Sequence, residues 1–130
     1  MGGNLSLVAA LSGTEFEMET DGRILMLEDV GEAPYKVDRM LRTLQLAGRL
    51  DKITGVVLGT FTRRDDEDTS GEETTIKQVL TEYFGQRGIP VIYNFPVGHH
   101  ECNITLPHGA RYEINADRCE LKLLENPVTP

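Results

Sequence analysis

The sequence predicts an α/β domain in which a mixed β-sheet carries helices on one side and the chain closes with a C-terminal β-hairpin. Apolar segments of strand length alternate with amphipathic helical segments through the middle of the chain, and strand-like segments end it. The chain has 130 residues, 39% of them apolar and 26% charged, which is typical of one soluble globular domain. We therefore interpret residues 1–130 as a single domain with its own core.

The N-terminal part of the chain predicts a short helix followed by a strand. Residues Leu5–Leu11 are mostly apolar, with Asn4 before them as a capping residue and Gly13 after them as a stop. Residues Glu15–Thr20 alternate polar and apolar side chains, which is the period of a strand.

Two buried strands and a helix follow. The apolar run Ile24–Leu27 and the segment Ile53–Phe61 have the composition of strands covered on both faces. Between them, residues 33–48 place apolar side chains at helical spacing. Pro34 suits the first turn of this helix, and Gly48 suits the left-handed position after it.

The C-terminal half predicts one more helix and three strands. An apolar stripe from Ile76 to Phe84, with Gly85 at its end, is typical of an amphipathic helix. The apolar residues at 89–95 predict a strand. Residues 110–125 contain two alternating segments joined around Asn115, Ala116 and Asp117, which predicts a hairpin.

Charge and hydropathy exclude two classes of partner. The net charge is −8 and the basic residues are scattered, which disfavours a nucleic-acid surface. No apolar run approaches the roughly 18 residues that span a bilayer, so we expect no membrane partner. The acidic run at 63–73 predicts a solvated loop, with a cation site formed by Asp65, Asp66, Glu67 and Asp68 as the alternative.

Two ionisable residues follow apolar strands. Glu28 comes directly after Ile24–Leu27, and His99 comes shortly after the strand at 89–95. Residues just past the end of a buried strand are firmly held and commonly face a cleft. A carboxylate and an imidazole are also two members of a serine-type triad. The alternatives are a surface turn residue for Glu28 and a loop histidine bonded to backbone for His99.

The histidine-rich stretch "NFPVGHHECNITLPHG" permits other chemistry. A metal site could use His99, His100, Cys102 and His108, although adjacent histidines rarely reach one ion and no familiar ligand spacing occurs. Cys102 is a possible thiol nucleophile, but no helix N-terminus is expected near it to lower the pKa of its thiol. Two distant cysteines, Cys102 and Cys119, favour reduced thiols over a disulfide framework.

The nucleophile of a serine-type triad has no candidate in this chain. Serine occurs only at positions 6, 12 and 70, and none of these lies in a Gly-x-Ser-x-Gly turn. With Glu28 and His99 as candidates and no nucleophile, the chain looks like two-thirds of a triad.

Three segments resemble the C-terminal half of the LD-carboxypeptidase family of serine peptidases. They are "GGNLSLV", "GRILMLEDVGEAPYKVDRMLRTLQLAGRLDKITGVVLGTF" and "IPVIYNFPVGHHECNITLPHGARYEI", in the family's order. The resemblance implies a swivelling β/β/α fold. It also implies that Glu28, in the motif "LED", and His99, in the motif Gly-His-x-x-x-Asn, are catalytic. Asp29 and Asn103 are near-site candidates for substrate binding.

The same resemblance implies that the nucleophile lies on an N-terminal domain that is absent from these 130 residues. We expect a cytoplasmic enzyme that needs no metal or cofactor and cleaves a peptide with a D-amino-acid end. Its homodimeric state is a further expectation from the family. A microcin-type self-immunity substrate and a non-catalytic binding module with the same fold are the alternatives. If the triad assignment holds, the side chains of Glu28 and His99 must approach each other at one edge of the domain.

Overall fold

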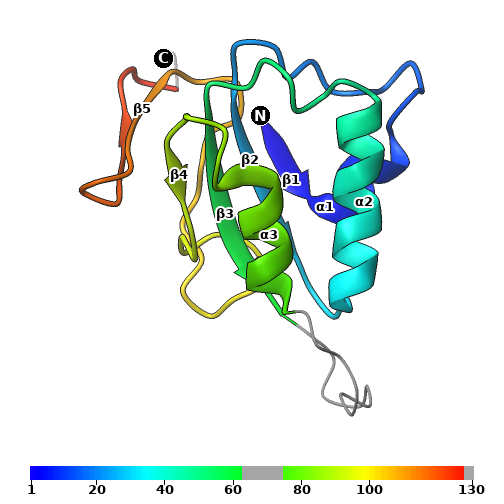
Figure 1. The fold of residues 1–130 in the computed structure, drawn as a ribbon. Helices are drawn as coiled ribbons and strands as arrows, with labels where there is room; N and C mark the ends of the chain where they lie inside the picture. Colours follow the sequence, from blue (N-terminus) through cyan, green and yellow to red (C-terminus); the bar gives the residue numbers. More distant parts are fainter. Residues whose placement is uncertain (63–74, 128–130) are drawn as a thin grey trace.

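The computed structural model describes residues 1–62 and 75–127, and it contains a parallel β-sheet, three helices and a separate hairpin (Figure 1). The sheet has the order β1-β2-β3-β4, and all its pairings are parallel. The strands are β1 (Gly2–Asn4), β2 (Ile24–Asp29), β3 (Gly55–Phe61) and β4 (Val91–Ile92). The helices are α1 (Leu5–Ala10), α2 (Pro34–Leu46) and α3 (Ile76–Phe84).

The three helices cover one face of the sheet and form the core with it. Alternate residues of β2, Leu25 and Leu27, are buried with the apolar stripes of the helices. The other face of β2 presents Ile24 and Met26 to a cavity of about 450 Å³. The hairpin β5 (Tyr112–Asn115) and β6 (Glu120–Leu123) lies on that side (Figure 1).

The helix predictions are confirmed, and local signals explain the helix ends. Asn4 Oδ1 accepts a hydrogen bond from the Leu7 amide at 3.3 Å and caps α1. Pro34 is the first residue of α2, and Gly48 after that helix has φ +74°. A capping box between Thr75 and Gln78 begins α3.

The predicted α/β class is confirmed, but the sheet is not mixed. Its four strands are all parallel, and the antiparallel pair β5–β6 forms a sheet of its own. The strand expected at 89–95 is paired with β3 only at Val91 and Ile92. Strand β1 was not predicted, because three residues that include two glycines have no strand pattern of their own.

The strand expected over Glu15–Thr20 is wrong, because this segment forms turns and irregular structure. Both edges of β2 are already paired, with β1 and β3. Among the described residues no strand pairs with this segment, so its backbone groups have no ladder to join, whatever its side-chain period. Phe16 is 69% exposed, and Met18 packs against the core.

None of the helices in the described ranges is long and apolar enough to cross a membrane.

Candidate active site

Glu28 lies at the carboxyl end of β2, where the pairing with β3 is irregular. Leu27 pairs with Leu58 and Asp29 pairs with Phe61, so two residues of β3 lie opposite the single residue Glu28. Such a β-bulge changes the direction in which side chains point and is frequent beside active sites. The side chain of Glu28 is only 6% exposed. A buried carboxylate requires hydrogen-bond donors, and these come from a distant loop.

His99 is carried by a loop that is fastened to the end of β3. The amide of Phe95 donates to the Leu58 carbonyl at 2.9 Å, and the amide of Thr60 donates to the Val97 carbonyl at 3.1 Å. These two bonds extend the β3–β4 pairing beyond the short strand β4 and bring the following residues over Glu28. We call residues 95–104 the histidine loop.

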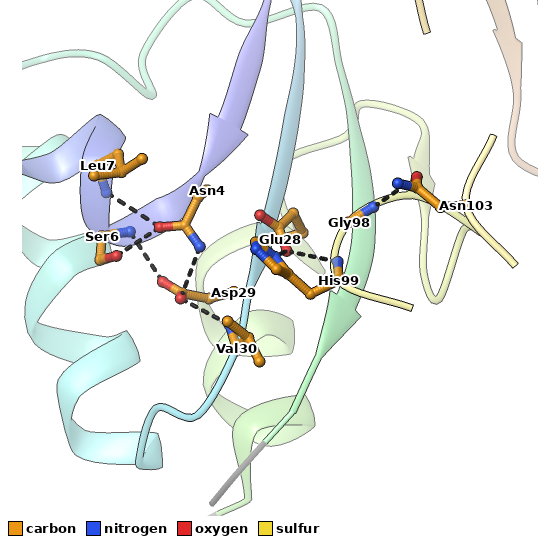
Figure 2. A network of polar contacts seen from close by, with 9 residues as sticks. All are labelled: Asn4, Ser6, Leu7, Glu28, Asp29, Val30, Gly98, His99 and Asn103. Carbon is orange, nitrogen blue, oxygen red and sulfur yellow. Dashed lines mark hydrogen bonds and ion pairs between the residues drawn. The ribbon is translucent and has the colours of Figure 1, made fainter. Parts of the chain in front are cut away.

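The side chains of Glu28 and His99 meet at this edge of the sheet, as Figure 2 shows. His99 Nδ1 lies 2.9 Å from Glu28 Oε2, and the backbone amide of His99 donates to the same oxygen at 3.3 Å. The two residues are 71 positions apart in the chain. The approach that a triad requires is therefore present.

The contact with Glu28 determines which ring nitrogen of His99 is free. An ionised carboxylate accepts a hydrogen bond, so Nδ1 carries a proton and Nε2 is left as the basic nitrogen. The ring is 61% exposed. Among the described residues, no group forms a hydrogen bond with Nε2. The site thus presents a basic nitrogen outward, to whatever faces this edge.

The carboxylate also changes the acidity of the imidazole. The hydrogen bond that His99 donates to Glu28, followed by the negative charge of Glu28, raises the pKa of His99 above its ordinary value of 6.5. Partial desolvation opposes this effect, and the charge of Asp29 adds a smaller upward contribution. Glu28 therefore stabilises the imidazolium form of His99.

Comparison with known proteins assigns the chain to a family. The sequence profile described as the LD-carboxypeptidase C-terminal domain matches residues 1–114. The chain is a member of the LD-carboxypeptidase C-terminal domain family.

Relatives and solved structures agree with this assignment. The chain is 36% identical to the probable murein peptide carboxypeptidase of Bacillus subtilis, over 88% of this chain and 36% of that relative. It is 29% identical to the murein tetrapeptide carboxypeptidase of Pseudomonas aeruginosa, over 91% of this chain and 38% of that relative. It is likewise 29% identical to the microcin C7 self-immunity protein of Escherichia coli, over 96% of this chain and 36% of that relative.

Two solved structures show the same fold. The muramoyltetrapeptide carboxypeptidase of Oxalobacter formigenes superposes with a TM-score of 0.74 and 35% identity, over 85% of this chain and 39% of that protein. A microcin C7 self-immunity protein superposes with a TM-score of 0.84 and 27% identity, over 99% of this chain and 38% of that protein. The LD-carboxypeptidase domain described here thus spans well under half the length of the relatives it matches.

Asp29 is the next residue after Glu28 in this LD-carboxypeptidase domain, but its carboxylate faces the other side of β2. Its oxygens accept hydrogen bonds from Asn4 Nδ2 at 3.0 Å, the Ser6 amide at 2.9 Å and its own neighbour, the Val30 amide, at 2.8 Å (Figure 2). These contacts join the end of β2 to the start of α1. Substrate binding by Asp29 stays a prediction, and the contacts observed are internal to the domain.

Asn103 holds the histidine loop closed. Its Oδ1 accepts a hydrogen bond from the Gly98 amide at 3.2 Å (Figure 2). The Ile104 amide donates to the Pro96 carbonyl at 2.9 Å and closes the loop a second time. Asn103 is exposed, and a contact between its side chain and substrate stays a prediction.

The other histidines and Cys102 are not gathered around His99. His100 Nδ1 accepts a hydrogen bond from the Cys102 amide at 3.1 Å, and His108 lines the cavity beside the hairpin. In the part of the chain that the structure describes, no three metal-ligating side chains lie together. Both cysteines are exposed and unpaired. The cation site considered for Asp65, Asp66, Glu67 and Asp68 lies outside the described residues.

Sequence reasoning missed one residue of this site, Gly59. It lies on β3 beside Glu28, and an ideal Cβ there would be 3.0 Å from Glu28 Cβ. The signal was available, because a glycine inside the apolar segment "GVVLGTF" commonly marks a bulge or a close backbone approach.

Proposed function

We propose that this domain supplies the histidine and the glutamate of a Ser-His-Glu triad in a serine-type LD-carboxypeptidase. The observation that supports this most directly is the 2.9 Å contact between His99 Nδ1 and Glu28 Oε2, with Nε2 directed away from the carboxylate. The nucleophilic serine and the oxyanion donors come from an N-terminal domain of the full-length protein. The substrate is a peptide that ends in a D-amino acid, such as a murein tetrapeptide.

Each step uses Nε2 of His99 as the proton carrier. Nε2 removes the proton from the serine hydroxyl while the serine oxygen bonds to the carbonyl carbon between the L- and D-residues. The carbon–nitrogen bond then breaks, and Nε2 returns the proton to the departing amine. Water, deprotonated by Nε2, attacks the acyl-enzyme, and the serine oxygen leaves with that proton. Glu28 holds the Nδ1–H tautomer and stabilises the imidazolium formed twice in this cycle.

The proposal extends to the cofactor requirement, the oligomeric state and the cellular location of the full-length enzyme. No metal or cofactor takes part. The full-length enzyme is a homodimer in the cytoplasm, where it releases D-alanine from cell-wall peptides that are being recycled.

A second substrate class is favoured by one relative. The microcin C7 self-immunity protein has been solved in complex with glutamyl sulfamoyl guanosine, an aminoacyl nucleoside analogue. The same triad chemistry would cleave an acyl-nucleotide peptide of that kind. A non-catalytic module is the remaining alternative.

The test begins with this chain alone and a peptide ending in L-Lys–D-Ala or meso-diaminopimelyl–D-Ala. We expect no release of D-alanine, because the attacking oxygen and the oxyanion donors are missing. Adding the N-terminal domain in trans, or using the full-length protein, is expected to give turnover. Full-length protein that releases D-alanine from neither peptide but cleaves an aminoacyl sulfamoyl nucleoside would favour the second substrate class.

The same assay can overturn the serine mechanism. Turnover by the chain alone, abolished by Cys102→Ala, would identify a thiol nucleophile within this domain. Folded full-length protein without activity on either substrate class would favour the non-catalytic module.

A further inference from the structure

Glycines lie on both sides of the Glu28 side chain, one on β3 and one in the histidine loop. An ideal Cβ at Gly59 would lie 2.5 Å from the Val97 carbonyl oxygen and 3.0 Å from Glu28 Cβ. An ideal Cβ at Gly98 would lie 2.6 Å from Oε2, 2.8 Å from Cγ and 2.9 Å from Cβ of Glu28. Real Cβ atoms essentially never lie under 3.0 Å from a non-bonded atom, so a side chain at Gly59 requires the loop to move, and one at Gly98 requires Glu28 or the loop to move.

Gly59 sets how closely the histidine loop approaches β3. The residues on either side of it, Leu58 and Thr60, form the two hydrogen bonds that fasten the loop. The Val97 carbonyl oxygen lies over the space that a Cβ would fill. The missing side chain therefore permits the backbone approach on which the position of His99 depends.

Gly98 turns the chain so that both N–H groups of His99 face Glu28. Its φ of +105° lies in a region that residues with a Cβ rarely adopt. After this turn, the amide and Nδ1 of His99 lie 3.3 Å and 2.9 Å from the same oxygen, Oε2. Oε2 is also the atom nearest to the missing Cβ of Gly98.

We propose that Gly59 and Gly98 are positioning residues, which together form a slot that holds the Glu28 carboxylate against both N–H groups of His99. The catalytic meaning of this slot rests on the proposed function. The geometry of the slot does not depend on the proposed function. The slot and the proposed function can therefore be disproved separately. A methyl group in the slot is expected to displace the carboxylate from Nδ1 and leave the rest of the fold in place.

The test is an NMR titration of the three histidine rings in this chain, in the wild type and in three variants. Glu28→Gln gives the His99 pKa without the carboxylate. We expect Gly98→Ala to lower the His99 pKa by a comparable amount. Gly109→Ala is the matched control, because Gly109 also has a positive φ, +81°, but nothing lies within 4 Å of its ideal Cβ. Asp29, the other charged group that acts on His99, is unchanged in all of them.

A double-mutant cycle measured by denaturant unfolding separates the slot contact from simple backbone strain. Gly98→Ala is expected to lower the unfolding midpoint less in a Glu28→Ala background, where the opposing atoms beyond Cβ are gone. Gly109→Ala is expected to change the unfolding midpoint by the same amount in both backgrounds. If Gly98→Ala does not fold alone, recovery of folding in the Glu28→Ala background supports the slot equally well.

Three results would overturn the proposal. The first is a His99 pKa unchanged by Gly98→Ala while Glu28→Gln lowers it. The second is a decrease in the unfolding midpoint on Gly98→Ala that is equal in the wild-type and Glu28→Ala backgrounds. The third is a His99 pKa unchanged by Glu28→Gln. That result would mean that Glu28 and His99 do not interact in solution. If the slot behaves as expected but full-length His99→Ala keeps its turnover, the proposed function fails and the positioning contacts stand.

Discussion

The two sides of the end of β2 use neighbouring carboxylates in different ways. Glu28 and Asp29 are both buried, with 5% and 3% of their surfaces exposed. Asp29 faces α1, and its partners are two amides and the side-chain amide of Asn4. Glu28 faces the histidine loop, and its partner is a ring that can gain or lose a proton.

Burial alone therefore does not distinguish the carboxylate proposed to act in catalysis from its neighbour. The donors of Asp29 are backbone and amide N–H groups, which do not titrate, so this carboxylate stabilises a strand–helix junction. The partner of Glu28 is 61% exposed, and no group in the described ranges forms a hydrogen bond with its second ring nitrogen. A buried acceptor that orients an exposed imidazole is an arrangement suited to general acid–base catalysis.

The largest expected effect is that of removing the proton carrier. In the full-length enzyme, His99→Ala is expected to lower kcat by roughly 10³–10⁶-fold, because triad members act as a unit. His100→Ala is the matched control. Its ring accepts a hydrogen bond from the Cys102 amide and does not contact Glu28, so we expect activity within a few-fold of wild type. Steady-state release of D-alanine measures both, and near-normal turnover by folded His99→Ala enzyme would place the general base elsewhere.

Replacing the carboxylate that contacts His99 is expected to have the next largest effect. Glu28→Gln keeps the shape of the side chain but loses the charge, so the imidazolium is no longer stabilised and the tautomer is not fixed. We expect kcat to fall roughly 10²–10⁴-fold. Glu113→Gln on the exposed side of β5 is the control and should retain activity. A Glu28→Gln enzyme as active as this control would contradict a triad role.

Replacing the structural carboxylate is expected to change stability more than turnover. Asp29→Ala leaves the amides of Ser6 and Val30 without their acceptor, which costs about 2–3 kcal/mol of unfolding free energy. Denaturant unfolding of this chain measures the loss. Asp117→Ala in the exposed hairpin turn should stay within about 0.5 kcal/mol of wild type. Equal stabilities of the two variants would mean that the junction contributes nothing.

The smallest expected effect is a pH dependence of the Glu28–His99 pair. Because Glu28 raises the pKa of folded His99, the pair stabilises the protein below the ordinary histidine pKa, and this contribution disappears as the pH rises through the raised value. The difference in unfolding free energy between wild type and Glu28→Gln should therefore shrink from about pH 6 to about pH 9. Denaturant unfolding at both pH values measures it, and a constant difference would contradict a titrating pair.

The same shift predicts the acid limb of the catalytic pH profile. His99 acts as a base only when neutral, so kcat/KM of the wild-type enzyme should begin to rise at a higher pH than that of Glu28→Gln. Identical acid limbs would mean that a group other than His99 is being titrated.

Local sequence patterns predicted most of the secondary structure and both residues of the pair. Helix caps, helical spacing and apolar runs are properties of neighbouring residues, so α2, α3, β2 and β3 follow from them. Glu28 and His99 were identified by what precedes them, an apolar strand in each case, and by the motifs that resemble the family. The same local reasoning failed at Glu15–Thr20, where the side-chain period is that of a strand but no strand in the described part of the chain pairs with it.

Only the tertiary structure decided how the end of β2 is used. Side-chain alternation sends Glu28 and Asp29 to opposite faces, but the sequence does not say which face meets a histidine and which meets a helix. That depends on the bulge opposite Glu28 and on the approach of a loop 71 residues away. The approach needs the absence of Cβ atoms at Gly59 and Gly98, and the space around a residue is set by backbone segments that are neighbours only after folding.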